Sequence, residues 1–207
     1  MTDVAIAVVG ASWGGLSALT SLVSSLPEDF SLPLAVVQHR SRHADNLLVS
    51  LLQDVTGLRV VDVEDKESLE PGSVYIAPAN YHMMVERGHL SLTTDPMVRF
   101  SRPSIDVMFI SAADAYPGQT LGVVLTGAND DGARGLRHIV NRGGRAIVQD
   151  PETAESPTMP RAALEAVPQA EVIKLENIPA RLMTLAKPAL RVRELDSDPY
   201  APRERAE

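Results

Sequence analysis

The sequence of 207 residues predicts an α/β fold built on a mostly parallel sheet. Short apolar runs rich in β-branched residues, such as Ala5 to Val9 and Leu34 to Gln38, have the continuous hydrophobicity of strands that are covered on both faces. Segments with apolar residues at helical spacing follow them, among them Leu16 to Leu22. Strands and helices that alternate in this way are joined by right-handed crossovers, which makes the sheet parallel.

The next elements are a helix and a group of short strands. Leucines and valine at helical spacing predict a helix over Asp45 to Val55. From Leu58 to Thr94 the strands become shorter and are separated by Pro-Gly and Arg-Gly turns, which is typical of hairpins. We expect an antiparallel excursion that covers one end of the sheet. Its strands are Leu58 to Val63, Ser73 to Ile76, Met83 to Arg87 and Leu90 to Thr93.

The second half of the chain returns to alternating helices and strands. The expected elements are a helix over Ser104 to Ala115, a strand over Leu121 to Leu125, a helix from about Ala133 to Asn141, a strand over Arg145 to Gln149, a helix that starts at Pro160, a strand over Glu171 to Leu175 and a helix over Ile178 to Leu190. No internal repeat or linker is visible. We therefore expect one domain over residues 1–190 and a charged, solvated tail over residues 191–207.

Composition excludes several classes of function. The chain contains no cysteine, so thiol catalysis, disulfides and thiolate metal sites are excluded. A net charge of -8 disfavours nucleic acid and anionic membranes as partners. No apolar run approaches the roughly 20 residues that a bilayer requires, and no signal peptide is indicated. We expect a cytoplasmic protein that is not inserted in a membrane, with no cofactor and no metal site, because no His, Asp and Glu set has ligand spacing.

The turn after the first strand carries a candidate nucleophile. Residues Gly10 to Gly14 fit the pattern G-x-S-x-G, in which glycines permit a tight turn that exposes a serine hydroxyl. The N-terminus of the following helix favours negative charge that develops near Ser12. The alternative interpretation is a turn whose serine only caps the helix.

Two further side chains of suitable chemistry follow strands. His39 comes directly after Leu34 to Gln38, and the loop after Leu121 to Leu125 contains Asp130 and Asp131. Functional groups of open α/β sheets gather at the carboxyl ends of the strands. An imidazole can accept the proton of a serine, and a carboxylate can orient the imidazole, so Ser12, His39 and Asp131 or its neighbour Asp130 are candidates for a triad. Taken separately, a packed histidine and a turn aspartate remain alternatives.

These motifs belong to a wider pattern, which resembles the catalytic domain of the chemotaxis protein-glutamate methylesterases (CheB type). The matching segments extend over most of the chain in the order of that family. They are VVGASWGG (Val8 to Gly15), VVQHR (Val36 to Arg40), GSVYIAPANYHM (Gly72 to Met83), RPSIDVMF (Arg102 to Phe109), VVLTGANDDGARG (Val123 to Gly135) and MPRAAL (Met159 to Leu164).

The resemblance implies a fold, an activity and a set of site residues. The fold is a doubly wound, three-layer α/β/α sheet with a small antiparallel hairpin. The activity is that of a serine esterase that removes methyl groups from glutamate methyl esters on receptor helices, with deamidation of glutamine in many members. The nucleophile, base and carboxylate fall on Ser12, His39 and Asp131. The backbone amides of Trp13 and Ala128 are the candidates that stabilise the oxyanion.

The sequence departs from the family at three positions of the site. Trp13 replaces a usual threonine, Ala128 a methionine and Asn129 a glycine, so we expect a changed mouth and a changed loop backbone. The family's receiver domain has no counterpart ahead of the first strand, and we expect any receiver to act in trans. A second interpretation is therefore a catalytically silent binding module in another signalling system. A third, nucleotide binding at the glycine turn, is weakened because Gln38 and His39 stand where an acidic ribose ligand is expected.

Overall fold

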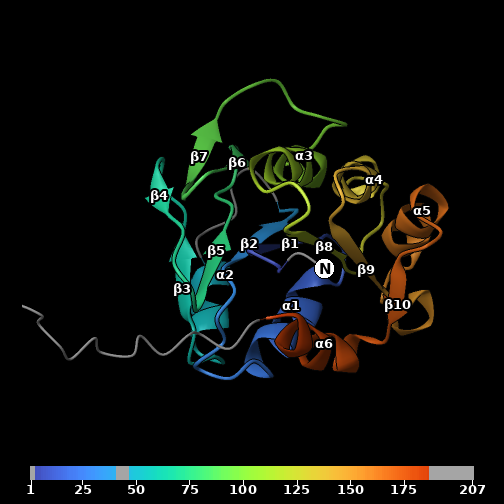
Figure 1. Cartoon of the computed structure of the whole chain (residues 1–207), viewed down its shortest axis with the longest axis horizontal. Coiled ribbons are helices and arrows are strands. Elements are labelled where there is room, and N and C mark those ends of the chain that lie inside the picture. Colours follow the sequence, from blue (N-terminus) through green and yellow to red (C-terminus); the bar gives the residue numbers. More distant parts are fainter. Residues whose placement is uncertain (1–2, 41–46, 187–207) are drawn as a thin grey trace, which may run out of the picture.

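A computed structural model describes residues 3–40 and 47–186 of the chain (Figure 1). Its centre is a seven-stranded sheet with the order β10-β9-β8-β1-β2-β5-β3, in which all neighbouring strands are parallel. The strands are β1 (Ile6–Ala11), β2 (Leu34–Gln38), β3 (Arg59–Asp62), β5 (Ser73–Ile76), β8 (Thr120–Val124), β9 (Arg145–Gln149) and β10 (Glu171–Ile173). The predicted parallel sheet is confirmed.

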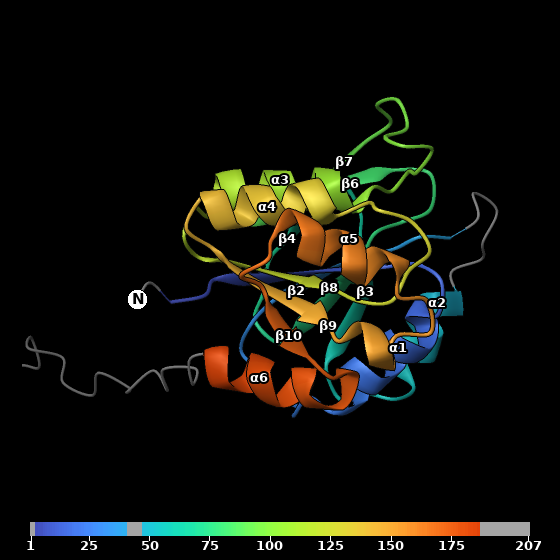
Figure 2. The same ribbon diagram turned by 90° about the vertical axis from the view of Figure 1, so that its right-hand side faces the viewer.

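Helices cover both faces of this sheet, as the side view in Figure 2 shows. One layer contains α1 (Gly15–Ser24), α2 (Leu47–Gln53) and α6 (Ile178–Leu185), and the other contains α3 (Ile105–Ala115), α4 (Ala133–Asn141) and α5 (Thr158–Ala166). In β1, Ala7 and Val9 belong to the core cluster of the first layer, while Ile6 and Val8 belong to that of the second. A strand that is buried on both faces must be apolar at consecutive positions, which explains the continuous run in the sequence. The doubly wound, three-layer fold is therefore confirmed.

The small antiparallel sheet differs in part from the prediction. It contains β4 (Glu67–Ser68), β7 (His89–Thr93) and β6 (His82–Glu86), in that order. The expectation that Leu58 to Val63 and Ser73 to Ile76 are antiparallel is wrong, because β3 and β5 pair in parallel within the main sheet. All of β5 is buried, which suits the interior of a parallel sheet better than a hairpin. The small sheet packs beside α3 in one helix layer, where β6 contacts α3.

Several element boundaries shift by a few residues. Helix α5 begins at Thr158, two residues before Pro160, which lies in the first turn where a missing N–H costs no hydrogen bond. Helix α6 ends at Leu185 because Ala186 has an extended backbone. The short helices η1 (Pro151–Thr153) and η2 (Leu175–Asn177) follow β9 and β10. The start predicted at Asp45, the end predicted at Leu190 and the tail over 191–207 lie outside the described residues.

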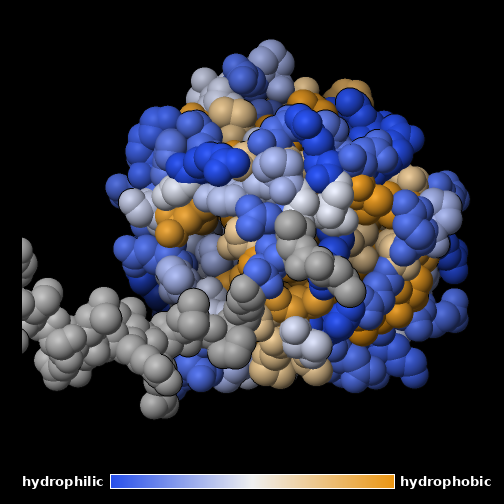
Figure 3. All heavy atoms as spheres, in the orientation of Figure 1, coloured by the Kyte–Doolittle hydropathy of each residue, from blue (hydrophilic) through white to orange (hydrophobic). Residues whose placement is uncertain are grey.

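Within residues 3–40 and 47–186, no helix is long and apolar enough to cross a bilayer. Hydrophilic residues cover most of the face drawn in Figure 3, with smaller hydrophobic areas between them.

The topology brings three loops together at the carboxyl ends of the central strands of the main sheet. Strand β1 lies between β2 and β8, with Ala11 beside Gln38 and Gly10 beside Val124. The loops that follow β1, β2 and β8 therefore lie next to one another. Strands β2 and β8 lie on opposite sides of β1, so the strand order reverses at this point. Ligands of open α/β sheets bind at such a switch point.

Candidate functional site

Ser12 lies directly after β1, at the start of a tight turn into α1. Its N–H donates to the carbonyl of Thr126 at 3.0 Å, and its own carbonyl accepts from the N–H of Gly15 at 2.9 Å. Gly14 has a φ of 76°, which favours glycine, and a Cβ on Gly15 would lie 1.9 Å from Oε1 of Gln38. Gly14 is thus required by its backbone conformation and Gly15 by close packing. The turn leaves the Ser12 hydroxyl without a hydrogen-bond partner among the described residues.

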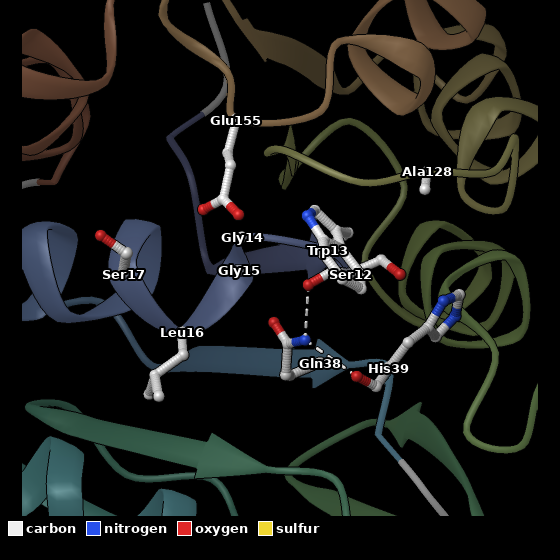
Figure 4. A pocket seen from close by; sticks show the side chains of 10 residues that line it. All are labelled: Ser12, Trp13, Gly14, Gly15, Leu16, Ser17, Gln38, His39, Ala128 and Glu155. Atoms are coloured by element: carbon white, nitrogen blue, oxygen red, sulfur yellow. Dashed lines mark hydrogen bonds between the residues drawn. The ribbon is translucent and has the colours of Figure 1, made fainter.

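A pocket of about 690 Å³ opens above this turn. Ser12 and His39 both line it, and in Figure 4 their side chains point toward one another from the ends of β1 and β2. Gln38 joins the two loops, because its side-chain Nε2 donates to the carbonyls of Ser12 and His39 at 2.8 Å each. The lining residues are Ser12, Trp13, Gly14, Gly15, Leu16, Ser17, Gln38, His39, Ala128 and Glu155.

His39 is held by a buried carboxylate. Its Nε2 lies 2.8 Å from Oδ2 of Asp131, which is only 1% exposed. Asp131 also accepts hydrogen bonds from the Ser104 hydroxyl at 3.0 Å and from the N–H groups of Ile105 at 2.7 Å and Asp106 at 3.0 Å. Burial alone would raise the pKa of Asp131, but the bonds from His39 and from the start of α3 outweigh burial and lower this pKa. Asp131 is therefore a charged acceptor at neutral pH.

Asp130 takes no part in this contact. Its carboxylate is paired with the guanidinium of Arg99, and its side chain is 57% exposed. Of the two neighbouring aspartates that the sequence offered, the structure brings Asp131 to His39 and leaves Asp130 at the surface.

Asn129 makes the second contact to the imidazole. Its Nδ2 lies 3.1 Å from Nδ1 of His39, and its Oδ1 accepts the N–H of Asp131 at 3.1 Å. From the sequence, Asn129 is only a departure from the family in this loop, and nothing predicts its contact with His39. Nothing in the sequence predicts the contacts of Gln38 either. Both contacts cross between separate elements, so no local pattern indicates them.

The two oxyanion candidates border the pocket from opposite loops. Trp13, which follows Ser12, is 66% exposed, and its carbonyl accepts from the Thr126 hydroxyl at 2.9 Å. Ala128 lies on the loop after β8 and also lines the pocket. Within the described part of the chain, the backbone N–H groups of Trp13 and Ala128 donate to no carbonyl. The described structure thus leaves both N–H groups without a carbonyl acceptor.

The described ranges, residues 3–40 and 47–186, contain no group of three or more His, Asp or Glu side chains arranged to hold a metal ion. The buried His82 serves the fold instead: its Nδ1 accepts the N–H of Ser104 at 3.2 Å, and its Nε2 donates to the carbonyl of Pro96 at 3.1 Å.

Known proteins resemble the chain in sequence and in structure. A family model described as CheB methylesterase matches residues 7–182. A Leptospira interrogans protein named putative protein-glutamate methylesterase/protein-glutamine glutaminase is 42% identical over 172 residues, which cover 83% of this chain and 89% of that protein. The protein-glutamate methylesterase FrzG of Myxococcus xanthus is 38% identical over 179 residues, which cover 86% of this chain and 54% of FrzG. The crystal structure of the Thermotoga maritima CheB methylesterase catalytic domain matches with a TM-score of 0.85 and 31% identity, over 89% of this chain and 100% of that domain.

Proposed function

The chain belongs to the CheB methylesterase family and is an ester hydrolase of that family, and on this premise we propose that Ser12, His39 and Asp131 are its catalytic triad. The observation that carries the proposal is the 2.8 Å contact between the buried Asp131 and His39, which lines the same pocket as Ser12. A histidine held in this way can accept a proton from a serine and return it to a leaving group.

The substrate class that we propose is a glutamate methyl ester on a receptor-type signalling protein. The relatives' names support it, because they pair protein-glutamate methylesterase with protein-glutamine glutaminase. A glutamine amide presents the same carbonyl as a glutamate ester, with ammonia in place of methanol as the leaving group. One site therefore suits both reactions, and we include deamidation in the proposal.

Acylation is the first half of the proposed reaction. The Ser12 hydroxyl attacks the ester carbonyl while Nδ1 of His39 takes its proton, and a tetrahedral oxyanion forms. The N–H groups of Trp13 and Ala128 are the donors that we assign to this oxyanion. When the tetrahedral centre collapses, the bond to the methoxy group breaks and His39 passes the proton to the departing methanol.

Hydrolysis of the glutamyl-enzyme completes the cycle. A water molecule gives a proton to Nδ1 of His39 and attacks the acyl carbonyl. The bond to Ser12 then breaks, His39 returns the proton to the Ser12 oxygen, and the substrate protein leaves with a glutamate side chain. Asp131 stabilises the imidazolium in both halves and keeps the ring oriented. The exposed rim beside Trp13 is open to a protein substrate. We also propose that a separate receiver domain controls the activity in trans.

The test of the triad is loss of methanol release from methylated receptor membranes. We expect Ser12→Ala to lower the rate at least about a thousandfold, since the covalent step is lost. Ser17→Ala is the matched control, because Ser17 lines the same pocket on α1 and its hydroxyl points away from His39 in Figure 4.

Labelling by a fluorophosphonate separates the esterase from the silent binding module. An active serine is labelled at Ser12 and the Ser12→Ala protein is not. A folded wild-type protein that releases no methanol and takes no label would contradict the proposed activity and favour the binding module.

A further inference from the structure

The side-chain amide of Asn129 has a defined orientation. Its Oδ1 accepts the backbone N–H of Asp131 at 3.1 Å, and a backbone N–H can only donate. The atom that faces His39 must therefore be Nδ2, which is also a donor. It lies 3.1 Å from Nδ1 of the ring.

This orientation determines the tautomer of the resting imidazole. Because Asn129 offers a donor, Nδ1 of His39 must be the acceptor, with its lone pair directed at the amide. The ring proton then lies on Nε2, where it is donated to Asp131 at 2.8 Å. His39 thus has the tautomer that a general base needs, but its single basic lone pair already has a partner.

We propose that the Asn129 amide occupies the base nitrogen of His39 in the resting site and competes for it with the Ser12 hydroxyl. The inference rests on the proposed triad and adds a determinant of its rate. An imidazole nitrogen has one lone pair in the plane of the ring, so it cannot accept good hydrogen bonds from both groups. The amide must move away from Nδ1 before Ser12 can transfer its proton.

The other contacts of the site show that the ring does not need Asn129 for its orientation. Asp131 binds Nε2 and is itself fixed by Ser104, Ile105 and Asp106. Loss of the Asn129 amide therefore leaves the imidazole in place and frees its lone pair. A neutral hydrogen bond of this kind contributes modestly, so its removal should speed reaction of Ser12 by about three- to tenfold.

The direct test is a ¹⁵N spectrum of the histidine rings in the full chain. In the wild type we expect the His39 signals of a protonated Nε2 and a hydrogen-bonded, unprotonated Nδ1, with assignment by a His39→Gln variant. In Asn129→Ala the Nδ1 resonance should move toward that of a free acceptor nitrogen. A wild-type proton on Nδ1, or an Nδ1 resonance that Asn129→Ala leaves unchanged, would overturn the inference.

The rate test uses fluorophosphonate labelling of Ser12 with two variants of Asn129. Asn129→Ala should be labelled faster, and Asn129→Ser should behave alike, because a serine oxygen can still accept the Asp131 N–H and preserve the turn. Asp130→Asn is the control with an unchanged rate, since Asp130 faces Arg99 at the surface. Equal or slower labelling in both Asn129 variants would overturn the inference. A wild type without any labelling would instead contradict the triad itself, and the nitrogen spectrum would still decide whether the hydrogen bond exists.

Discussion

Two buried carboxylates lie where α3 meets α4, and each accepts hydrogen bonds from the start of the other's helix. Asp131, on the loop that leads into α4, accepts the N–H groups of Ile105 and Asp106 at the start of α3. Asp106, in the first turn of α3, accepts the N–H groups of Gly132 at 3.0 Å and Gly135 at 2.7 Å at the start of α4. Asp131 and Asp106 are 1% and 2% exposed, so their backbone environments and burial are closely matched.

The pKa values of the two carboxyls nevertheless shift in opposite directions. Burial raises the pKa of Asp106 and outweighs its bonds to α4, and the negative charge of Asp131 adds to this increase. The pKa of Asp131 is lowered despite burial, because His39 adds a hydrogen bond and a partner that can carry positive charge. Oδ2 of Asp106 has no hydrogen-bond partner in the described part of the chain. Both carboxyls accept N–H groups from a helix N-terminus, and the contact with the imidazole is the main difference that lowers the pKa of Asp131 while that of Asp106 is raised.

The largest effect that should separate the two sites is on catalysis. Asp131→Asn should lower methanol release by about 10⁴-fold, because an amide nitrogen facing Nε2 would favour the wrong tautomer of His39. Asp106→Asn should cause a far smaller loss, because its remaining oxygen can still accept from Gly132 and Gly135. The measurement is the turnover of methylated receptor membranes by the two purified variants.

Asp130→Asn provides the control for this pair, since it makes the same chemical change one residue away from Asp131. Circular dichroism should show that all three variants are folded. Similar losses of methanol release in Asp131→Asn and Asp106→Asn would contradict the distinction between the two carboxyls.

The second effect concerns stability and its dependence on pH. At neutral pH, Asp131→Asn should lower the free energy of unfolding by about 1–3 kcal/mol, because the amide cannot accept from all the donors that face it. A carboxyl with a lowered pKa in the folded state stabilises the fold above its ordinary pKa of about 3.9, and this contribution is lost as the pH falls below that value. The difference between wild type and Asp131→Asn should therefore shrink from pH 6 to pH 3 in urea unfolding. A difference that stays constant or grows toward pH 3 would count against a charged Asp131.

Much of the fold was predictable because its signals are local. Apolar runs that are continuous along the chain gave β2 (Leu34–Gln38) and β9 (Arg145–Gln149) at their observed bounds. The error at β3 and β5 has a physical origin, since the turn at Pro71 and Gly72 is typical of a hairpin. Strand β5 is buried in the main sheet, between segments that are distant in the sequence. The turn residues do not specify this parallel pairing.

The site was predictable only as far as strand ends could place it. Ser12 and His39 follow buried strands, and neighbouring parallel strands present their carboxyl ends at one edge. The choice between Asp130 and Asp131 required the family resemblance, because both lie at the end of the same loop. The contact from Asn129 to His39 joins residues 90 positions apart and depends on side-chain orientation, which no sequence pattern specifies.

The smallest effect should come from Asp106, and its sign should be opposite to that of Asp131. A carboxyl with a raised pKa in the folded state costs stability once the unfolded chain ionises above about pH 3.9, and the cost is complete when the pH passes the folded-state pKa. Asp106→Asn removes the ionisation and keeps one oxygen for the N–H groups of α4. Relative to wild type, the variant should gain stability as the pH rises from 4 to 8, measured by urea unfolding across that range. The other carboxylates contribute equally to both proteins. A gain that is independent of pH, or one that falls with rising pH, would therefore show that the Asp106 carboxyl is ionised in the folded protein as easily as in the unfolded chain.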